Sequence, residues 1–184
     1  MKINTTSIEG LLVLEPDVFR DERGFFLETF HEQKYEELGI ERNFVQDNLS
    51  LSSKGILRGL HFQYRKPQAK LVQVLLGEVY DVAVDIRRGS ATFGKYFGIM
   101  LSQDNLYQLF IPEGFAHGYC VVSETALFAY KCSEFYSPSY EGGLLWSDPD
   151  IGIEWPISDP LLSQKDSRLP CLSAFPKDWL TFAI

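Results

Sequence analysis

The sequence has no apolar run that approaches the roughly 18 residues a membrane-spanning helix needs. Its start, MKINTTSIEG, lacks the apolar stretch and the small-residue cleavage site of a secretory signal. Cysteine is scarce, and the three thiols are widely spaced without a CxxC pair: Cys120, Cys132 and Cys171. We therefore expect a cytoplasmic protein with reduced thiols, and neither a disulfide framework nor a cysteine zinc site.

Positive charge is also in short supply. The chain carries 17 Lys and Arg against 25 Asp and Glu, a formal net charge of -8. This balance argues against general nucleic-acid binding, which depends on neutralising phosphates. An anionic small ligand would need Arg and Lys gathered locally. No GxGxxG motif opens a helix, so a built-in dinucleotide domain is not expected.

What the sequence does contain is a folded, strand-rich domain. With 184 residues, 45% hydrophobic and 14% aromatic, it can bury a substantial core, and we expect a single domain over residues 1–184. Many short strands separated by turn signals predict an all-β fold, a sandwich or barrel of the jelly-roll kind. The β-type runs cover residues 9–16, 23–30, 79–87, 96–102, 106–112, 116–122 and 126–136.

Helix and irregular chain occupy little of the sequence. Only EQKYEELG, residues 32–39, has a clearly helical pattern, with Gly39 as its expected C-terminal stop. The last forty residues are expected to form an irregular segment that wraps the surface, because prolines interrupt them at Pro149, Pro156, Pro160, Pro170 and Pro176.

One stretch nearly matches the residue spacing of a metal-binding motif, or box: GILRGLHFQYRKPQAKLVQVLLGEV, residues 55–79. His61 and Gln63 share one face of a strand, and a later strand must bring Lys70 alongside. Downstream, PEGFAHGY places His117 at the position of a second box histidine. Together these segments resemble the cupin superfamily, whose jelly-roll barrel usually holds a divalent metal. Here a glutamine and a lysine replace two of its ligands.

Those two replacements change the chemistry that the pocket can support. A protonated lysine repels a dication and offers no lone pair, so we predict no catalytic metal. An ammonium at Lys70 can instead stabilise a developing oxyanion, and removing one such contact typically costs about 2.7 to 4 kcal/mol of barrier.

Seven successive blocks resemble one enzyme family, the dTDP-4-dehydrorhamnose 3,5-epimerases. The blocks are RDERGFFLETF, FVQDNLS, GILRGLHFQ, KLVQVLLGEVYDVAVDIR, IPEGFAHGY, YKCSEFYSP and WSDPDIGIEWP. The resemblance implies a cupin enzyme without metal or cofactor, usually a homodimer, with no nucleic-acid or membrane partner. It implies action on a thymidine-diphosphate 4-keto-6-deoxy sugar, inverting carbons 3 and 5 on the way to dTDP-L-rhamnose.

The same resemblance implies roles for individual residues. His61 matches the base, whose unperturbed pKa of roughly 6.5 suits proton abstraction near neutrality. Asp166 matches the carboxylate that orients this imidazole, and Tyr130 the acid that reprotonates the opposite face. Lys70 matches the enolate stabiliser. His117 is either a helper of Lys70 or a satisfied core histidine.

Substrate contacts are implied at a wider set of positions. Tyr136 matches the aromatic residue that stacks on thymine, while Arg23, Arg58 and Lys165 suit a diphosphate. The full set is Arg23, Glu28, Gln46, Asp47, Asn48, Arg58, Lys70, His117, Tyr136, Glu141 and Lys165.

Three local points stay open in the sequence. Strict strand alternation directs Arg58 away from His61, although a bulge at Gly59 could aim both into one cleft. Asp81 and Asp85 fit either an exposed strand face or a supporting role behind the site. The segment between His61 and Lys70 is one residue shorter than is usual in the family, which bears on the contacts of this loop.

Other functions compete with the double epimerase. A 3-epimerase or ketosugar isomerase acting on a related nucleotide sugar would have the same pocket, and Tyr130 favours the double epimerase. A non-enzymatic sugar-binding cupin would have lost the base or its orienting acid. A metal-dependent cupin is disfavoured by Gln63 and Lys70.

Overall fold

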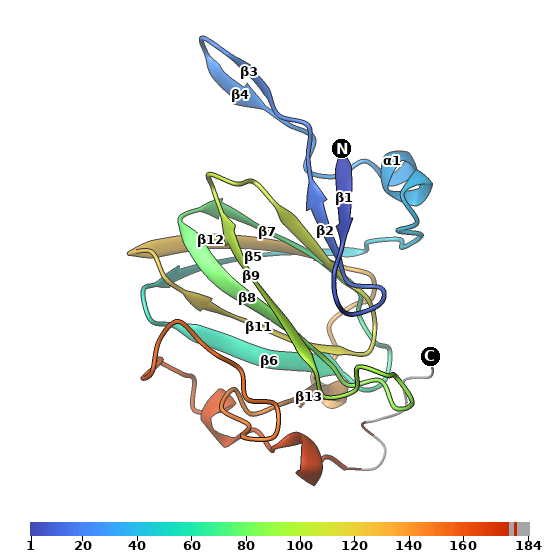
Figure 1. Ribbon diagram of the computed structural model, residues 1–184, viewed down its shortest axis with the longest axis vertical. Helices are drawn as coiled ribbons and strands as arrows, with labels where there is room; N and C mark the ends of the chain where they lie inside the picture. Colours follow the sequence, from blue (N-terminus) through green and yellow to red (C-terminus); the bar gives the residue numbers. More distant parts are fainter. Residues whose placement is uncertain (177–178, 180–184) are drawn as a thin grey trace.

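Two antiparallel sheets face each other in a jelly roll, which confirms the predicted all-β fold (Figure 1). The computed structural model describes residues 1–176 and 179. One sheet has the strand order β1-β2-β10-β7-β12-β5 and the other the order β13-β6-β11-β8-β9. The sheets do not close into a continuous barrel. Within the described residues, no helix is long and apolar enough to cross a membrane.

The six-stranded sheet and its attachments have the following bounds. Its strands are β1 (Lys2–Thr5), β2 (Leu12–Glu15), β5 (Gln46–Ser53), β7 (Lys70–Leu76), β10 (Gln108–Ile111) and β12 (Thr125–Cys132). A separate hairpin, β3 (Phe19–Asp21) and β4 (Gly24–Phe26), and the helix α1 (Glu32–Glu37) lie between β2 and β5 in the chain.

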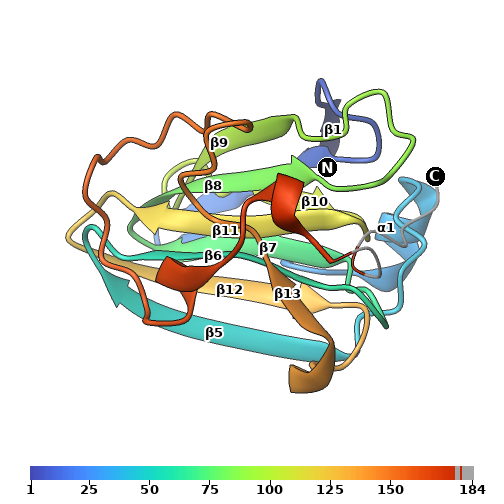
Figure 2. The same ribbon diagram turned by 90° about the horizontal axis from the view of Figure 1, so that it is seen from below.

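The second sheet contains β6 (Leu57–Gln63), β8 (Glu78–Asp85), β9 (Tyr96–Ser102), β11 (Phe115–Val121) and β13 (Glu141–Gly143). Three short 3-10 helices follow β12 in the chain: η1 (Pro138–Tyr140), η2 (Asp166–Arg168) and η3 (Leu172–Ala174). The C-terminal segment runs across the outside of this sheet (Figure 2).

Strand β8 shows how the two faces of the second sheet are covered. Val79 and Ala83 belong to the core between the sheets. Val82 and Val84 face outward, where the C-terminal segment covers them with Ile151, Ile153, Trp155, Leu172 and Phe175. The prediction that the proline-rich tail wraps the surface is therefore confirmed, and the wrapping explains why β8 is apolar on both faces.

Several predicted elements are shorter in the structure. The helix ends at Glu37, and Gly39 follows with a φ of +84°, as expected of a helix stop. The strand predicted over residues 23–30 is reduced to β4, because the chain leaves the hairpin after Phe26. The strand predicted over residues 126–136 ends at Cys132, where the loop before η1 begins.

Candidate functional site

A cavity of about 420 Å³ opens between the two sheets on the side of β5 and β6. Its size lies within the range of small-molecule pockets. Four strands, β5, β6, β11 and β12, and the turn at η2 supply most of its wall. The lining comprises Gln46, Asn48, Ser50, Arg58, His61, Phe62, Gln63, Gln68, Lys70, His117, Gly118, Tyr119, Phe128, Tyr130, Cys132, Tyr136, Glu141, Ser163, Lys165 and Asp166.

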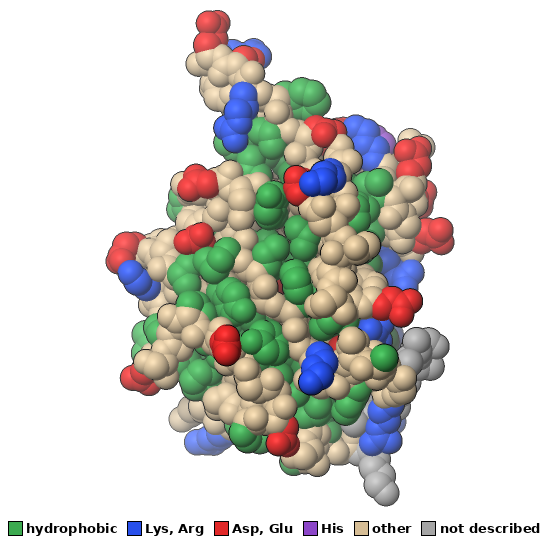
Figure 3. Space-filling view, viewed as in Figure 1, with side chains coloured by type: hydrophobic (Ala, Val, Ile, Leu, Met, Phe, Trp, Pro, Cys, Tyr) green, Lys and Arg blue, Asp and Glu red, His purple; other side chains and the backbone are tan. Residues whose placement is uncertain are grey.

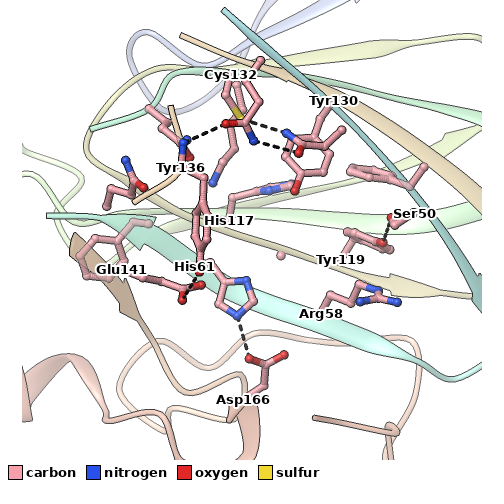
Figure 4. Close-up of a pocket in the computed structure, with 18 of the residues that line it drawn as sticks. Ser50, Arg58, His61, His117, Tyr119, Tyr130, Cys132, Tyr136, Glu141 and Asp166 are labelled. Carbon is pink, nitrogen blue, oxygen red and sulfur yellow. Dashed lines mark hydrogen bonds and ion pairs between the residues drawn. The ribbon is translucent and has the colours of Figure 1, made fainter. Parts of the chain in front are cut away.

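His61 and Asp166 form a hydrogen-bonded pair in the wall of this cavity (Figure 4). His61 Nε2 lies 2.7 Å from Asp166 Oδ1. Because a carboxylate only accepts, Nε2 carries the hydrogen and Nδ1 keeps its lone pair. Burial is the largest single influence and would raise the pKa of Asp166, but the hydrogen bond from His61 and the smaller contributions of Gly59 and Ser163 together lower it. The pair can therefore take up a proton at Nδ1 while the carboxylate stabilises the imidazolium.

A bulge in β6 brings Arg58 onto the same side as His61. His117 of β11 pairs with His61 and Tyr119 pairs with Arg58, so β6 has one residue more than β11 between these pairs. Gly59 lies in the bulge, and its N–H points at Asp166 Oδ2 at 3.5 Å. A side chain at Gly59 would not fit, since its Cβ would lie 2.5 Å from the Cα of Gly118. The bulge that the sequence left open is present, and Arg58 lines the cavity.

Lys70 enters the cavity from the first residue of β7. The residue is only 7% exposed, and its ammonium has no hydrogen bond or ion pair with any described residue. Burial lowers the pKa of Lys70, while nearby Cys132, Asp81 and Glu141 oppose this shift. An ammonium with unused donors in a cavity is suited to meet a negative charge on a bound molecule.

Tyr130 lies on β12, two residues before Cys132, which pairs with Lys70. Burial is the main cause that raises the pKa of Tyr130 to about 12. The phenol therefore keeps its proton across the neutral range and can act as a proton donor in the cavity.

His117 has a carboxylate partner of its own. Its Nε2 lies 3.0 and 2.9 Å from the two carboxylate oxygens of Asp81, and both residues are buried. Asp81 therefore has the supporting position that the sequence left open. Asp85 instead accepts hydrogen bonds from Arg87, Ser90 and Thr92 in the turn after β8, which is a structural role.

Tyr136 stands at one end of the cavity, and Arg58, Ser50 and Tyr119 stand at the other, with His61 between them (Figure 4). Tyr136 Oη donates to Glu141 Oε2 at 3.0 Å, and Lys165 Nζ donates to Glu141 Oε1 at 2.7 Å. Burial would raise the pKa of Glu141, but these two hydrogen bonds lower it. The end near Tyr136 thus combines a half-exposed ring with a lysine and a carboxylate.

Strand β5 lines the cavity with an unbroken polar face. Gln46, Asn48 and Ser50 point inward, whereas Leu49 and Leu51 point outward and are 62% and 64% exposed. Ser50 Oγ and Tyr119 Oη share a hydrogen bond of 2.7 Å, and Arg58 Nε donates to Ser52 Oγ at 3.0 Å. The inside of this edge strand is therefore built to contact a polar ligand.

Three of the residues implied for substrate contacts lie outside this cavity. Arg23 is paired with Asp21 in the hairpin, and Glu28 is paired with Lys34. Asp47 faces outward from β5, opposite to its neighbours, and accepts a hydrogen bond from Lys131 at 2.9 Å. The cavity brings together Gln46, Asn48, Arg58, His61, Lys70, His117, Tyr130, Tyr136, Glu141, Lys165 and Asp166.

Sequence reasoning gave no role to several residues that the structure places at the site. For Asp81 the sequence left open an exposed strand face or a supporting role, and the alternation of β8 puts it on one face with Val79 and Ala83. Ser50, Tyr119, Ser163 and Cys132 carry no local signal, because their position follows from strand pairing. No group of three or more potential metal-binding His, Cys, Asp or Glu side chains occurs in the described part of the chain.

The sequence profile of the dTDP-4-dehydrorhamnose 3,5-epimerases matches residues 5–174. The chain belongs to the dTDP-4-dehydrorhamnose 3,5-epimerase family. The resemblance inferred from the seven sequence blocks is thereby confirmed, and with it the assignment to an isomerase family.

Individual epimerases of the family are similar over nearly the whole chain. The dTDP-4-dehydrorhamnose 3,5-epimerase of Shigella flexneri is 56% identical over 168 residues, covering 90% of this chain and 93% of its own. A crystal structure of the Legionella pneumophila 3,5-epimerase in complex with dTDP-4-keto-L-rhamnose superposes with a TM-score of 0.97. It is 49% identical and covers 100% of this chain and 98% of its own. The dTDP-4-dehydrorhamnose 3-epimerase of Streptomyces niveus is 38% identical over 168 residues, 90% of this chain and 81% of its own.

Proposed function

We propose that this protein converts dTDP-4-dehydro-6-deoxy-D-glucose to dTDP-4-dehydro-L-rhamnose by epimerisation at carbons 3 and 5, a step towards dTDP-L-rhamnose. One observation carries the proposal. A His61–Asp166 pair, an ammonium at Lys70 without a hydrogen-bond or ion-pair partner among the described residues, and a protonated Tyr130 all line one cavity. These are the base, the oxyanion partner and the acid that inversion next to a ketone requires.

In the proposed reaction, His61 Nδ1 removes the hydrogen from the carbon beside the 4-keto group. The electron pair moves into the carbonyl, and the Lys70 ammonium stabilises the resulting enolate oxygen. Asp166 holds His61 in the tautomer that the base needs and stabilises the imidazolium formed. Tyr130 then delivers its proton to the opposite face of the same carbon, which completes the inversion.

The two reacting carbons flank one carbonyl, so the same groups can serve both once the His61 imidazolium has released its proton to solvent and the Tyr130 phenolate has taken one up. A shift or flip of the sugar ring between the steps would present carbon 3 and then carbon 5 to His61. His117, held by Asp81 in the same cavity, is proposed to assist Lys70 at the enolate oxygen. The nucleotide is held away from the chemistry, so its binding can orient the sugar without contacting the reacting bonds.

Tyr136 is proposed to stack on the thymine. Its ring is 49% exposed at the cavity end, and its hydroxyl is held by Glu141. Arg58 and Lys165 are proposed to contact the diphosphate, together with the polar side chains Gln46 and Asn48. No step in this scheme uses a metal or an organic cofactor.

A homodimer accounts for the positions of Arg23 and Glu28. The hairpin β3–β4 stands off from the body, with charged side chains near its tip (Figure 3). Phe19, Phe25 and Phe26 on this hairpin are all exposed. We propose that the hairpin and the segment directly after it pack on a second copy and bring Arg23 and Glu28 to the mouth of that copy's cavity.

The outer face of β5 is the proposed main contact between the two copies. Leu49 and Leu51 on this face, and Leu75 and Leu76 near the end of β7, are exposed apolar side chains. Leu49 and Leu51 alternate with inward-facing polar residues and so share this outer face, and exposed apolar side chains on an edge strand commonly mark a protein interface. We further propose a cytoplasmic location, since Cys120, Cys132 and Cys171 are all free thiols, as a reducing compartment favours.

A 3-epimerase is the second candidate, because one relative with 38% identity has that name. Incubation with dTDP-4-keto-6-deoxyglucose in heavy water separates the candidates. We expect deuterium at carbons 3 and 5 of the product. Deuterium at carbon 3 alone would establish the 3-epimerase, and deuterium at neither carbon would exclude both enzymes and leave a sugar-binding protein. The same incubation with a strong chelator tests the expected independence from metal.

A further inference from the structure

Gln63 occupies the place of a metal-ligating histidine in the cupin box, and the reaction proposed above gives it no task. Its side chain lines the cavity, yet the residue is only 3% exposed. A buried side-chain amide requires partners for its carbonyl and its NH₂ group. The partners that Gln63 has therefore indicate what it does.

All three partners of the Gln63 amide are backbone groups in two loops. Its Oε1 accepts a hydrogen bond of 2.6 Å from the N–H of Ser137. Its Nε2 donates to the carbonyl oxygen of Phe135 at 3.3 Å and to that of Lys66 at 2.7 Å. Gln63 thus joins the loop after β6 to the loop after β12, and it holds the residues on both sides of Tyr136.

A second glutamine holds Tyr136 itself. Gln46 Oε1 accepts a hydrogen bond of 2.8 Å from the N–H of Tyr136, and Gln46 Nε2 donates to Asn48 Oδ1 at 2.9 Å. Residues 135–137 are therefore fixed by two side-chain amides that come from β5 and β6, one strand from each sheet. We call this arrangement the glutamine clamp: Gln46, Gln63 and the backbone of residues 135–137.

The hydrogen bonds made at position 63 explain why its side chain carries an amide. A neutral histidine offers one donor and one acceptor, so it would leave one of the three backbone groups without its partner. A carboxylate only accepts and would face two carbonyl oxygens. Only an amide of this length supplies two donors and one acceptor from the same position.

We propose that Gln63 is a positioning residue for nucleotide binding, which sets the place of the Tyr136 ring by clamping the backbone on both sides of it. The proposal rests on the proposed function in one respect, namely that Tyr136 stacks on the nucleotide base. It assigns to this position a role in substrate binding in place of the metal coordination that other cupins have there.

The test is Gln63→Met, which keeps the length of the side chain and removes its hydrogen bonds. Of its three hydrogen bonds, the two to residues 135 and 137 hold the backbone beside Tyr136, and losing them should weaken dTDP binding about tenfold, measured by calorimetry. Binding of inorganic pyrophosphate, which has no base, should not change, and kcat should fall by less than about threefold because the reacting groups are untouched. Tyr64→Phe is the matched control: it removes the 2.8 Å hydrogen bond from Tyr64 Oη to the Ser139 carbonyl in η1, outside the clamp.

A double-mutant cycle with Tyr136→Ala shows whether Gln63 acts through Tyr136. In the Tyr136→Ala background, Gln63→Met should have no further effect on dTDP affinity. The inference is overturned if Gln63→Met weakens dTDP binding equally with and without Tyr136. It is also overturned if Gln63→Met weakens pyrophosphate binding as much as dTDP binding. If Gln63→Met fails to fold, Gln63→Glu provides the test, since it loses both donated hydrogen bonds and should also weaken dTDP binding.

The same cycle separates failure of the inference from failure of the proposed function. If Tyr136→Ala weakens dTDP binding but Gln63→Met does not, base stacking stands and the clamp is wrong. If Tyr136→Ala leaves dTDP affinity unchanged, Tyr136 does not stack on the base, and both that part of the proposed function and the inference fail.

Discussion

A buried lysine, Lys70, lies in the wall of the cavity. Lys70 is 93% shielded from solvent, since it is 7% exposed, and its ammonium has no ion-pair partner in the described chain. Burying a charge in this way is costly unless something compensates for it. A ligand that develops negative charge would provide the compensation at the moment of reaction, which is the physical reason for assigning Lys70 to the enolate oxygen.

The charge of Lys70 should set the alkaline limit of activity. Its pKa is lowered from the ordinary 10.5 by burial, and only the protonated form stabilises an enolate. Activity should therefore be present at lower pH and fall as pH rises through a value below 10.5. Initial rates of kcat/KM between neutral pH and pH 11 check this, and an alkaline limb above 10.5 would contradict it.

The fall in activity at high pH should not come from ionisation of Tyr130, because the pKa of this phenol is raised to about 12. The residual activity of Tyr130→Phe should accordingly keep an alkaline limb at the same pH as the unmodified protein. If the activity of this variant no longer falls at high pH, the fall in the unmodified protein comes from the Tyr130 phenol instead.

Asp166→Asn tests the orienting carboxylate. The amide preserves the shape of the side chain but cannot stabilise the imidazolium, so kcat should fall by roughly 100-fold or more while KM changes little. Ser167→Ala is the control, because it removes only the hydrogen bond to Gln164 from the same turn. Equal activity of the two variants would exclude a catalytic role for the His61–Asp166 pair.

At the scale of elements, the sequence pattern fails where strands line the cavity. Strand β5 was not among the predicted strands, because its polar residues face inward and its leucines face outward, the reverse of an ordinary surface strand. The apolar runs of β8, β9 and β11 were predicted, since both of their faces are covered or packed. The proposed catalytic residues were assigned by motif resemblance, and alternation along β8 placed Asp81 on one face with Val79 and Ala83. The positions of Ser50 and Tyr119 in the cavity depend on strand pairing that a sequence does not show.

The bulge at Gly59 gives an element-scale prediction. Gly59→Ala should lower the free energy of unfolding by about 2 to 4 kcal/mol, because its φ is +124° and the new Cβ would collide with Gly118. Gly24→Ala separates the two causes, since Gly24 has a φ of +126° but open space around it. Chemical denaturation measures the free energy of unfolding of both variants. Equal losses of this free energy would show that the close approach to Gly118 contributes nothing.

At the scale of the whole molecule, the hairpin and the outer face of β5 are surfaces that a monomer leaves exposed. Leu49→Glu should convert the proposed dimer to a monomer, since it places a charge on a 62% exposed apolar side chain at the proposed contact. Sedimentation velocity checks this, with Gln33→Glu on α1 as a control of equal charge. If Leu49→Glu sediments as the unmodified protein does, the interface lies elsewhere.

The central claim, that the Lys70 ammonium makes the proton next to the ketone removable, is tested most directly by Lys70→Met in heavy water. The rate of deuterium entry at carbons 3 and 5 of the bound sugar should fall at least about 100-fold. The affinity for dTDP should stay within about threefold, because the nucleotide is held at the other groups of the cavity. Deuterium entry at an unchanged rate in this variant would contradict the account.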